Sequence, residues 1–227
     1  MPRQPRYLLP GFPQHVIQRG NNRQPTFRSR RDFALYKRYL AESAHEHKCS
    51  IHAYVLMTNH VHLVVTPQTA MGIQKLMQSL GRRYVYYFNK THARTGTLWE
   101  GRYKACLIDT DGYVMSCCRY VELNPVRAGI VSDPVKYPYS SYAHNIGLRR
   151  DALVTPHELY LALGPNTKKR SAAYKKLFEQ RLDCAYLDRL RDATNSCLVF
   201  GSDGFCDLME QILSRPVRKQ RAGRKPV

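Results

Sequence analysis

The sequence predicts an α+β fold in which helices cover a mostly antiparallel sheet, as in ferredoxin-like sandwiches. Two observations support this. Up to about residue 124, the hydrophobic periodicity alternates between strand and helix patterns in the order β-α-β-β-α-β-α. Beyond residue 150, the composition shifts to basic segments with helical periodicity. We therefore expect one α/β domain over residues 1–150 and a small helical accessory region with a basic tail over residues 151–227.

Local signals set the limits of the elements in the first domain. Ser29 can cap a helix, and Thr58-Asn59 is a tight turn that should join two strands as a hairpin. Pro67 should end the second strand of that hairpin, and Pro125 should end the helix that precedes it. The expected strands cover residues 15–19, 51–57, 60–65 and 98–108, and the expected helices cover residues 30–48, 71–89 and 111–124.

The accessory region should consist of helices. The first has Thr155 as a cap and Pro156 in its first turn. The tail from residue 215 onward carries six Lys or Arg residues and no acidic residue. The expected helices of this region cover residues 155–163, 172–192 and 201–213.

The charge balance indicates a polyanionic partner. Lys and Arg total 36 against 17 for Asp and Glu, which gives a formal net charge of +19. Each phosphate that a basic side chain neutralises releases a counterion, so such an excess favours nucleic acid. The 16 Tyr and 7 Phe residues add stacking surfaces for unpaired bases. A basic surface that serves solubility alone is the weaker explanation.

The cysteine usage indicates a reducing compartment. The seven Cys residues are scattered and form no C-x-x-C pair, so we expect reduced thiols rather than disulfides or a zinc ribbon. The sequence has no apolar N-terminal segment and no apolar run of about 18 residues. It also shows no long basic amphipathic helix. The expected location is the cytoplasm, without a membrane partner.

Two pairs of polar side chains stand at spacings that suit a catalytic site. His60 and His62 share one face of an expected strand, while the apolar residues between and after them share the other. Tyr120 and Asn124 are four residues apart on an expected helix, so they also share a face. Two imidazoles with one oxygen ligand leave open positions on a divalent cation. A tyrosine nucleophile would conserve the energy of the phosphodiester bond in a phosphotyrosine.

Each pair alone has an ordinary interpretation. Most His pairs on a strand are structural or bind zinc, and Tyr120 is one of 16 tyrosines, of which most on helices belong to the core. His52, on the neighbouring strand, is more easily explained as a structural histidine than as a ligand. The combination of both pairs in a strongly basic chain is what favours phosphoryl transfer.

The block from residue 15 to about residue 142 resembles the tyrosine transposases of the IS200/IS605 type, the Y1 branch of the HUH nuclease superfamily. It looks most like the subgroup of REP-associated tyrosine transposases. The segments that carry the resemblance are His15-Val16-Ile17-Gln18-Arg19-Gly20-Asn21, Val55-Leu56-Met57-Thr58-Asn59-His60-Val61-His62-Leu63, Leu98-Trp99-Glu100-Gly101-Arg102-Tyr103 and Arg119-Tyr120-Val121-Glu122-Leu123-Asn124-Pro125-Val126-Arg127-Ala128-Gly129.

The resemblance implies an HUH α/β sandwich and a metal-dependent transposase and single-strand endonuclease. It implies that His60 and His62 hold one Mg²⁺ or Mn²⁺ ion and that Tyr120 is the nucleophile. Asn124 stands where the IS200 branch has a glutamine that completes the metal site, as it does in the REP-associated branch. The implied reaction is cleavage and rejoining of single-stranded DNA beside a hairpin, through a 5′-phosphotyrosine intermediate. The implied partner is therefore single-stranded DNA with a REP-like hairpin.

Basic and aromatic residues outside these motifs are candidates for binding that DNA. They lie on the N-terminal arm, on the turn after the first strand, on the helix over residues 71–89 and in the segment before the fourth strand. The basic tail is a further candidate, although a solvated tail explains it as well. The residues expected to contact DNA are Arg3, Arg6, Arg19, Asn21, Asn22, Arg23, Arg82, Arg83, Trp99, Arg102 and Lys104.

Three alternatives remain at this stage. A catalytically silent regulator that recognises DNA hairpins would keep the same fold. A replication initiator or relaxase would use similar chemistry with a different order of motifs. A carboxylate-triad transposase would need more acidic residues than this chain offers. The sequence is compatible with either a monomer or a homodimer.

Overall fold

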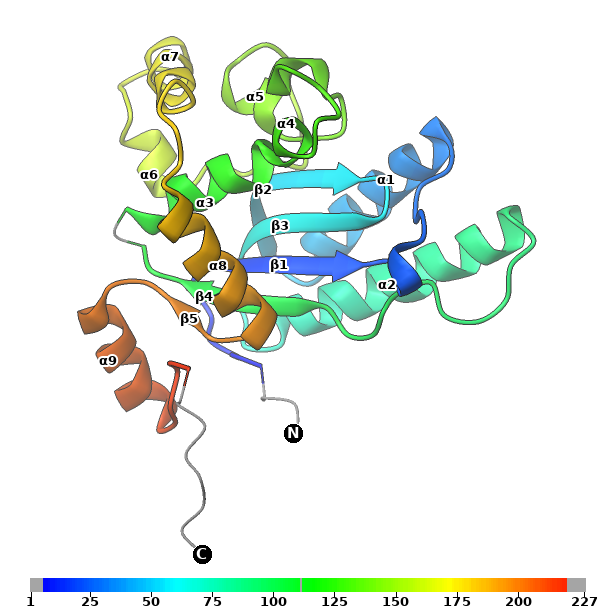
Figure 1. Ribbon diagram of the computed structural model, residues 1–227, viewed down its shortest axis with the longest axis horizontal. Coiled ribbons are helices and arrows are strands. Elements are labelled where there is room, and N and C mark those ends of the chain that lie inside the picture. Colours follow the sequence, from blue (N-terminus) through cyan, green and yellow to red (C-terminus); the bar gives the residue numbers. More distant parts are fainter. Residues whose placement is uncertain (1–5, 111, 220–227) are drawn as a thin grey trace, which may run out of the picture.

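The computed structural model describes residues 6–110 and 112–219, and its centre is a five-stranded sheet in the order β2-β3-β1-β4-β5 (Figure 1). Only the pair β4–β5 is parallel, so the expected α+β class with a mostly antiparallel sheet is confirmed. The strands are β1 (Gln14–Arg19), β2 (Cys49–Met57), β3 (His60–Pro67), β4 (Lys104–Ile108) and β5 (Val199–Phe200).

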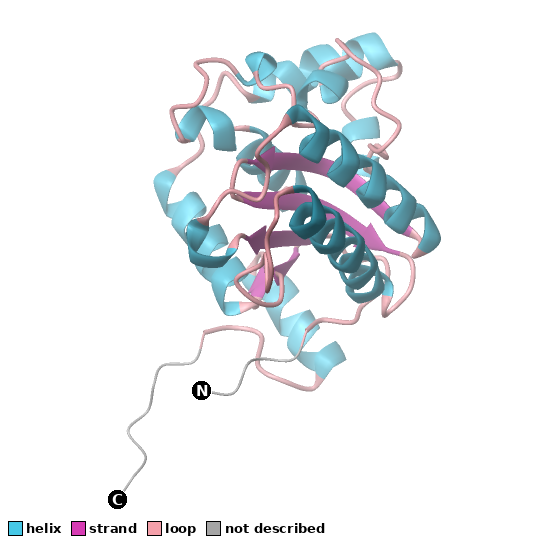
Figure 2. Cartoon of the chain, turned by 90° about the vertical axis from the view of Figure 1, so that its right-hand side faces the viewer, coloured by secondary structure: helices cyan, strands magenta, loops and turns pink. Residues whose placement is uncertain are grey.

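Helices pack on both faces of the sheet (Figure 2). The long helices α1 and α2 cover one face, and α3 and α8 cover the other. The α-helices are α1 (Arg30–Glu46), α2 (Gly72–Thr91), α3 (Tyr113–Glu122), α4 (Asn124–Arg127), α5 (Tyr142–Asn145), α6 (Glu158–Leu161), α7 (Thr167–Leu177), α8 (Cys184–Ser196) and α9 (Asp203–Leu213), and the short 3-10 helices are η1 (Asn21–Arg23) and η2 (Pro134–Lys136).

Period-two alternation divides the side chains of the β2–β3 hairpin between the two faces. Val61, Leu63 and Val65 join the core under α1 and α2, and Val64 joins the core under α3 and α8. The hairpin closes at Thr58-Asn59 as expected, because Met57 pairs directly with His60. His60 and His62 therefore lie on the α3/α8 face with Val64, as the sequence predicted.

Helix α1 begins where the sequence places it. The Ser29 side chain accepts a hydrogen bond from the Asp32 backbone amide, and the Asp32 carboxylate accepts one from the Ser29 amide at 2.9 Å. This reciprocal pair is a capping box, which satisfies two amides that would otherwise lack partners at the helix start.

One expected boundary around the fourth strand is wrong. The expected strand over residues 98–108 contains only β4, because the chain before Lys104 forms bends against the end of β1. The following helix does end before Pro125, since α3 stops at Glu122. Pro125 then stands at the start of α4, where its missing amide hydrogen costs no intrahelical bond. Helix α4 continues almost directly from α3 and so keeps Arg127 close to Asn124.

The region beyond residue 150 differs from its expected form in three respects. The first helix is capped by His157 rather than Thr155. The single helix expected over residues 172–192 is two helices, because the Asp183 side chain caps a new helix, α8, through the amide of Tyr186. Strand β5 was not expected, and it adds to the sheet beside β4.

Buried hydrogen bonds tie this region and the segment just before it to α3. The Glu122 carboxylate, which is fully buried, accepts hydrogen bonds from Asn145 at 2.8 Å and from Tyr174 at 2.9 Å, and from Ser141. Burial raises the pKa of Glu122 to about 7, although these hydrogen bonds oppose the rise. The contacts fix the C-terminal end of α3, two residues beyond Tyr120.

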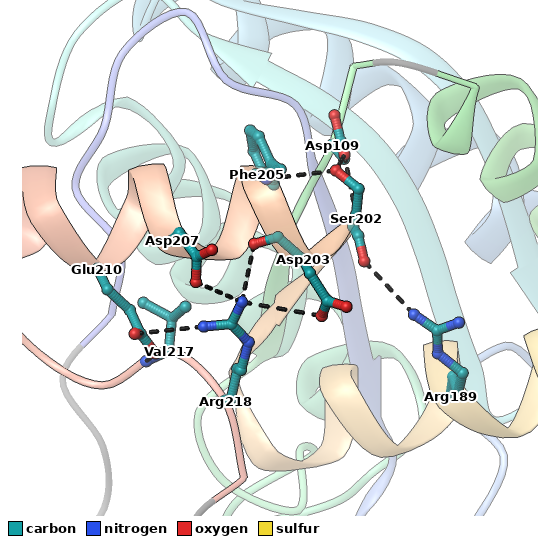
Figure 3. A network of polar contacts seen from close by, with 10 residues as sticks. Asp109, Arg189, Ser202, Asp203, Phe205, Asp207, Glu210, Val217 and Arg218 are labelled. Carbon is teal, nitrogen blue, oxygen red and sulfur yellow. Dashed lines mark hydrogen bonds and ion pairs between the residues drawn. The ribbon is translucent and has the colours of Figure 1, made fainter.

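One arginine holds the chain beyond α9 against that helix (Figure 3). Arg218 donates to the Asp203 carbonyl at 2.8 Å and to the Asp207 carboxylate at 2.7 Å, and it lies 3.3 Å from the Glu210 carboxylate. Val217 is fully buried, and its carbonyl accepts from the amide of Val199 at 3.2 Å. None of the helices in the described part of the chain is long and apolar enough to cross a membrane.

Candidate active site

Strands β1 and β3 bring the two predicted metal ligands together. His62 pairs with Ile17 across the β1–β3 ladder, and His60 pairs with Arg19. The two imidazole centroids are 5.0 Å apart, so both rings can reach one position above the sheet. His62 is 3 % exposed, whereas His60 is partly open to solvent.

Helix α3 brings Tyr120 to the same face. The Tyr120 ring lies edge-on to His62, with 5.8 Å between centroids, and edge-on to His15, with 5.5 Å between centroids. Tyr120 is 5 % exposed. The four predicted residues His60, His62, Tyr120 and Asn124 thus meet at one place, although about 60 residues separate the strand from the helix along the chain.

These side chains surround a cavity of about 300 Å³ on the α3/α8 face. Its lining combines residues of β1, β3, α3, α4 and α8. The lining residues are His15, Ile17, Arg19, Met57, His60, His62, Tyr120, Asn124, Arg127, Ala128, Arg191, Thr194 and Asn195.

A third histidine supports His62 from β1. The His15 Nε2 atom lies 2.8 Å from His62 Nδ1, and the angle between the two ring planes is 7°. On its other side, His15 Nδ1 lies 2.9 Å from the Thr194 hydroxyl oxygen of α8. Burial, with a smaller effect from the Arg127 cation, lowers the pKa of His15 to about 3.

The two predicted ligands are neutral at neutral pH. Burial, followed by the charge of Arg19, lowers the pKa of His60 to about 4. Burial, followed by the neighbouring His15 and His60, lowers the pKa of His62 well below its usual value. A neutral imidazole keeps a lone pair for a metal ion, so both histidines are in the protonation state that coordination requires.

Arg127 occupies the oxygen of Asn124. Its guanidinium donates to Asn124 Oδ1 at 2.9 Å and lies 4.0 Å from the centroid of the Tyr120 ring. The Asn124 amide nitrogen donates to the Tyr120 carbonyl at 3.2 Å. A carbonyl oxygen has two lone pairs, and Arg127 uses one of them. Asn124 can therefore bind a cation through the second lone pair, or through both if Arg127 moves away.

Arg191 of α8 brings a second guanidinium to the tyrosine. Burial alone would lower the pKa of Arg191, but hydrogen bonds to Tyr120 and Asp188 raise it above its usual value. Two cations beside the Tyr120 side chain attract the negative charge of a phosphate. Sequence reasoning missed both arginines.

A scan against family models now identifies the chain. The model described as "Transposase IS200 like" matches residues 11–124, just over half of the sequence. The chain belongs to the IS200-like transposase family. The matched segment includes His60, His62, Tyr120 and Asn124, and it ends before Arg127 and before all of α8.

One solved structure agrees with the family at the level of the fold. It is described as a "REP associates tyrosine transposase bound to a REP hairpin" and is similar with a TM-score of 0.52 and 14% identity over 69% of this chain and 99% of the other. A protein from Deinococcus radiodurans R1, itself only provisionally assigned as a transposase, has a TM-score of 0.37 and 20% identity over 57% of this chain and 92% of the other. No curated protein matches the chain. Family membership implies transposition through cleavage of single-stranded DNA.

The donor set of this transposase fits one divalent cation. The described residues contain no group of three or more His, Cys, Asp or Glu side chains that could hold a metal. A site here would therefore use His60 and His62 with a neutral oxygen, either from Asn124 or from the DNA. Two imidazole nitrogens and an amide oxygen suit Mn²⁺ and, less well, the harder Mg²⁺.

A basic groove continues from this cavity. It has a volume of about 610 Å³ and shares Ile17, Arg19 and Asn195 with the cavity. Five of the arginines and lysines predicted to contact DNA line it. The groove residues are Arg6, Ile17, Arg19, Arg23, Glu100, Gly101, Arg102, Tyr103, Lys104, Asn195, Ser196 and Cys197.

Other residues predicted to contact DNA lie elsewhere. Trp99 is 8 % exposed and packs on the aromatic core under α1 and α2, so its ring is not available for stacking on bases. Arg82 and Arg83 lie on α2, on the opposite face from the histidines, and Arg83 pairs with Glu42. Arg3 lies outside the described residues, as does the tail beyond residue 219.

The remaining two residues predicted to contact DNA lie beside the groove. Asn21 and Asn22 form the short helix η1 together with Arg23, and Asn22 is exposed. The Asn21 amide donates to the carbonyl of Leu98 at 2.9 Å, which fixes this turn against the segment before β4.

Proposed function

We propose that the protein is a metal-assisted tyrosine transposase that cleaves and rejoins single-stranded DNA beside a hairpin. Tyr120 is the nucleophile, and His60 and His62 hold one Mg²⁺ or Mn²⁺ ion. The observation that carries the proposal is the meeting of both imidazoles and the Tyr120 ring in one cavity that opens into a basic groove.

The residues of the cavity have different roles in strand transfer. A bound cation would withdraw charge from a non-bridging oxygen of the scissile phosphate. The Tyr120 hydroxyl gives up its proton to water and its oxygen forms a bond to phosphorus. The bond from phosphorus to the 3′ oxygen breaks, and that oxygen takes up a proton from water. Arg127 and Arg191 stabilise the negative charge of the phosphate during the attack. Attack of a 3′-hydroxyl on the phosphotyrosine reverses these bond changes and joins the strands.

The groove supports a single-stranded path into the site. Arg19 borders both the groove and the cavity, so a strand whose phosphates contact Arg102 and Lys104 can continue to His60. The similar fold of a transposase described as bound to a REP hairpin supports a hairpin beside the cleaved strand. The hairpin itself would lie outside the cavity, which has room for one nucleotide unit rather than a duplex.

The test uses single-stranded hairpin oligonucleotides labelled at either end, incubated with the protein and Mg²⁺ or Mn²⁺. We expect a free 3′-hydroxyl fragment and a fragment covalently attached to protein at its 5′ phosphate, both abolished by a chelator. The same hairpin without a single-stranded flank is the control substrate and should remain intact.

A silent hairpin-binding regulator is the second candidate. Two observations favour it: Tyr120 is only 5 % exposed, and Arg127 already occupies the oxygen of Asn124. Tight hairpin binding without any covalent product, with both metals and with varied flanks, would establish this candidate and reject the enzyme.

A further inference from the structure

We propose that His15, oriented by Thr194 of α8, is a positioning residue that selects the tautomer of His62 and thereby presents the His62 Nε2 lone pair to the cation. This inference rests on the proposed function, because it assigns a role at the proposed metal site. It extends that function, because His15 is neither a ligand nor a nucleophile and Thr194 lies outside the family match.

The direction of the hydrogen bonds follows from the Thr194 hydroxyl. This hydroxyl has one proton, which it donates to the carbonyl of Leu190 at 2.8 Å within α8. Its oxygen therefore acts as an acceptor toward His15 Nδ1, 2.9 Å away. The Cys106 thiol, 3.1 Å from the same oxygen, can only be a second donor to it. His15 thus carries its proton on Nδ1, and its Nε2 is left as an acceptor.

The same logic carries over to His62. His15 Nε2 lies 2.8 Å from His62 Nδ1, and two lone pairs cannot face each other at that distance. His62 must therefore hold its proton on Nδ1 and donate it to His15. The Nε2 atom of His62 is then unprotonated on the side of the ring away from His15. A ring nitrogen that binds a metal needs such a lone pair.

His60 reaches the same tautomer through a different partner. Its Nδ1 lies 2.7 Å from the side-chain oxygen of Asn59 in the hairpin turn, which can only accept. Both predicted ligands therefore present Nε2, and each is held by a hydrogen bond on the opposite nitrogen. This arrangement of supporting hydrogen bonds is typical of metal-binding histidines.

The hydrogen bonds from His62 to His15 and from His15 to Thr194 are more constrained than the bond from His60 to Asn59. His15 is 1 % exposed and Thr194 is 3 % exposed, so water cannot replace either partner. Loss of a supporting partner typically weakens metal binding by about 10–100-fold. His15→Phe keeps an aromatic ring but removes the acceptor, so we expect a loss of Mn²⁺ affinity in that range. His15→Gln can place its side-chain oxygen near the original Nε2 position and should restore affinity to within about threefold of wild type.

The first measurement is the tautomer itself. Long-range ¹H–¹⁵N spectra of metal-free protein labelled at histidine distinguish protonation on Nδ1 from protonation on Nε2. We expect Nδ1–H signals for His15, His60 and His62, and Thr194→Val should weaken the preference at His15 and His62 without changing His60. An Nε2–H signal at His62 in the wild-type protein would overturn the inference.

The second measurement is Mn²⁺ affinity without DNA, by titration calorimetry or electron paramagnetic resonance. Matched controls come from His52, a buried histidine on β2 whose nitrogens lie 2.7 Å from the Thr155 carbonyl and 2.9 Å from the Thr66 hydroxyl. His52→Phe and Thr66→Val should leave Mn²⁺ affinity unchanged. Folded His15→Phe and Thr194→Val proteins that bind Mn²⁺ like wild type would also overturn the inference.

The two proposals fail in different ways. A wild-type protein with Nδ1–H at His62 that binds Mn²⁺ and forms no DNA adduct contradicts the proposed function and supports the role of His15. A protein that forms the adduct with Nε2–H at His62 contradicts the role of His15 alone.

Discussion

The two faces of the sheet are built from the same strands and serve different purposes. On the α1/α2 face, Tyr36, Tyr84 and Trp99 pack against aliphatic residues in a core with ring centroids 4.9–6.3 Å apart. On the α3/α8 face, His60 and His62 of the same strand β3 border a cavity of about 300 Å³.

The difference shows how strand alternation separates stability from reactivity. Every second residue of β3 is apolar and fully or almost fully buried, and these residues hold the strand in place. His60 and His62, which alternate with them, can then carry chemistry, because a change at either does not open a hole in the aromatic core. Rigid strands also hold the reacting groups closer to their required geometry than loops would.

The largest expected effect comes from removing the nucleophile on the reactive face. Tyr120→Phe keeps the ring that contacts His15 and His62, so the melting temperature should stay close to that of wild type. Adduct formation should fall by roughly 10⁴-fold or more, because nothing else in the cavity replaces the oxygen. Gel analysis of the labelled hairpin measures the adduct. Tyr86→Phe, at an exposed tyrosine, is the matched control and should cleave normally.

Neighbouring substitutions on β3 test the separation of the faces directly. His62→Ala should reduce cleavage by more than about 100-fold, since it removes a proposed metal ligand. Leu63→Ala, one residue further and on the opposite face, should lower the free energy of unfolding by about 2–5 kcal/mol and leave the folded protein active within a few-fold. Denaturant titration and single-turnover cleavage measure the two quantities. Equal losses of activity in both variants would break the comparison.

A histidine outside the cavity should affect stability through pH. Burial lowers the pKa of His52 from 6.5 to about 4. Above pH 6.5, His52 is neutral in both the folded and the unfolded chain. As the pH falls from about 6.5 to about 4, His52 binds a proton in the unfolded chain but not in the folded chain. This lowers the free energy of unfolding by roughly 2–3 kcal/mol across that window. Between neutral and acidic pH, the free energy of unfolding of His52→Gln should fall by about 2–3 kcal/mol less than that of wild type. Urea titration at several pH values measures this difference. A pH dependence equal to that of wild type would contradict the effect of burial.

The smallest effect distinguishes the basic residues of the two faces. Arg102→Ala, in the groove, should reduce the slope of log affinity against log salt concentration for single-stranded DNA by about one unit. Arg83→Ala, on α2 and paired with Glu42, should leave the slope unchanged. Fluorescence anisotropy at several salt concentrations measures both. A larger change for Arg83 than for Arg102 would move the DNA path to the opposite face.

Most of the sheet and of the reactive face could be predicted from the sequence. The spacing of His60 and His62 on a strand, and of Tyr120 and Asn124 on a helix, placed each pair on one face through local geometry alone. The meeting of the two pairs was implied by the family resemblance, since no local signal relates residues about 60 positions apart.

The parts that could not be predicted depend on contacts between distant segments. Strand β5 has only two residues and exists because it pairs with β4, and α8 adds Arg191 and Thr194 to the cavity only through packing. Trp99 is an aromatic residue among cations in the sequence, which is a pattern typical of DNA contacts. Burial decides whether such a ring stacks on bases or joins the core, and the local sequence does not show burial. His15 had a readable signal as well, because it shares a strand face with Ile17 and Arg19.

The most direct test of the account is to identify the residue that carries the DNA. The wild-type protein would be incubated with Mn²⁺ and a single-stranded hairpin oligonucleotide, then digested with protease and nuclease, and the modified peptide sequenced by mass spectrometry. We expect one nucleotide adduct, on Tyr120, that disappears when either His60 or His62 is replaced. An adduct on another tyrosine, or one that persists without both histidines, would contradict this expectation.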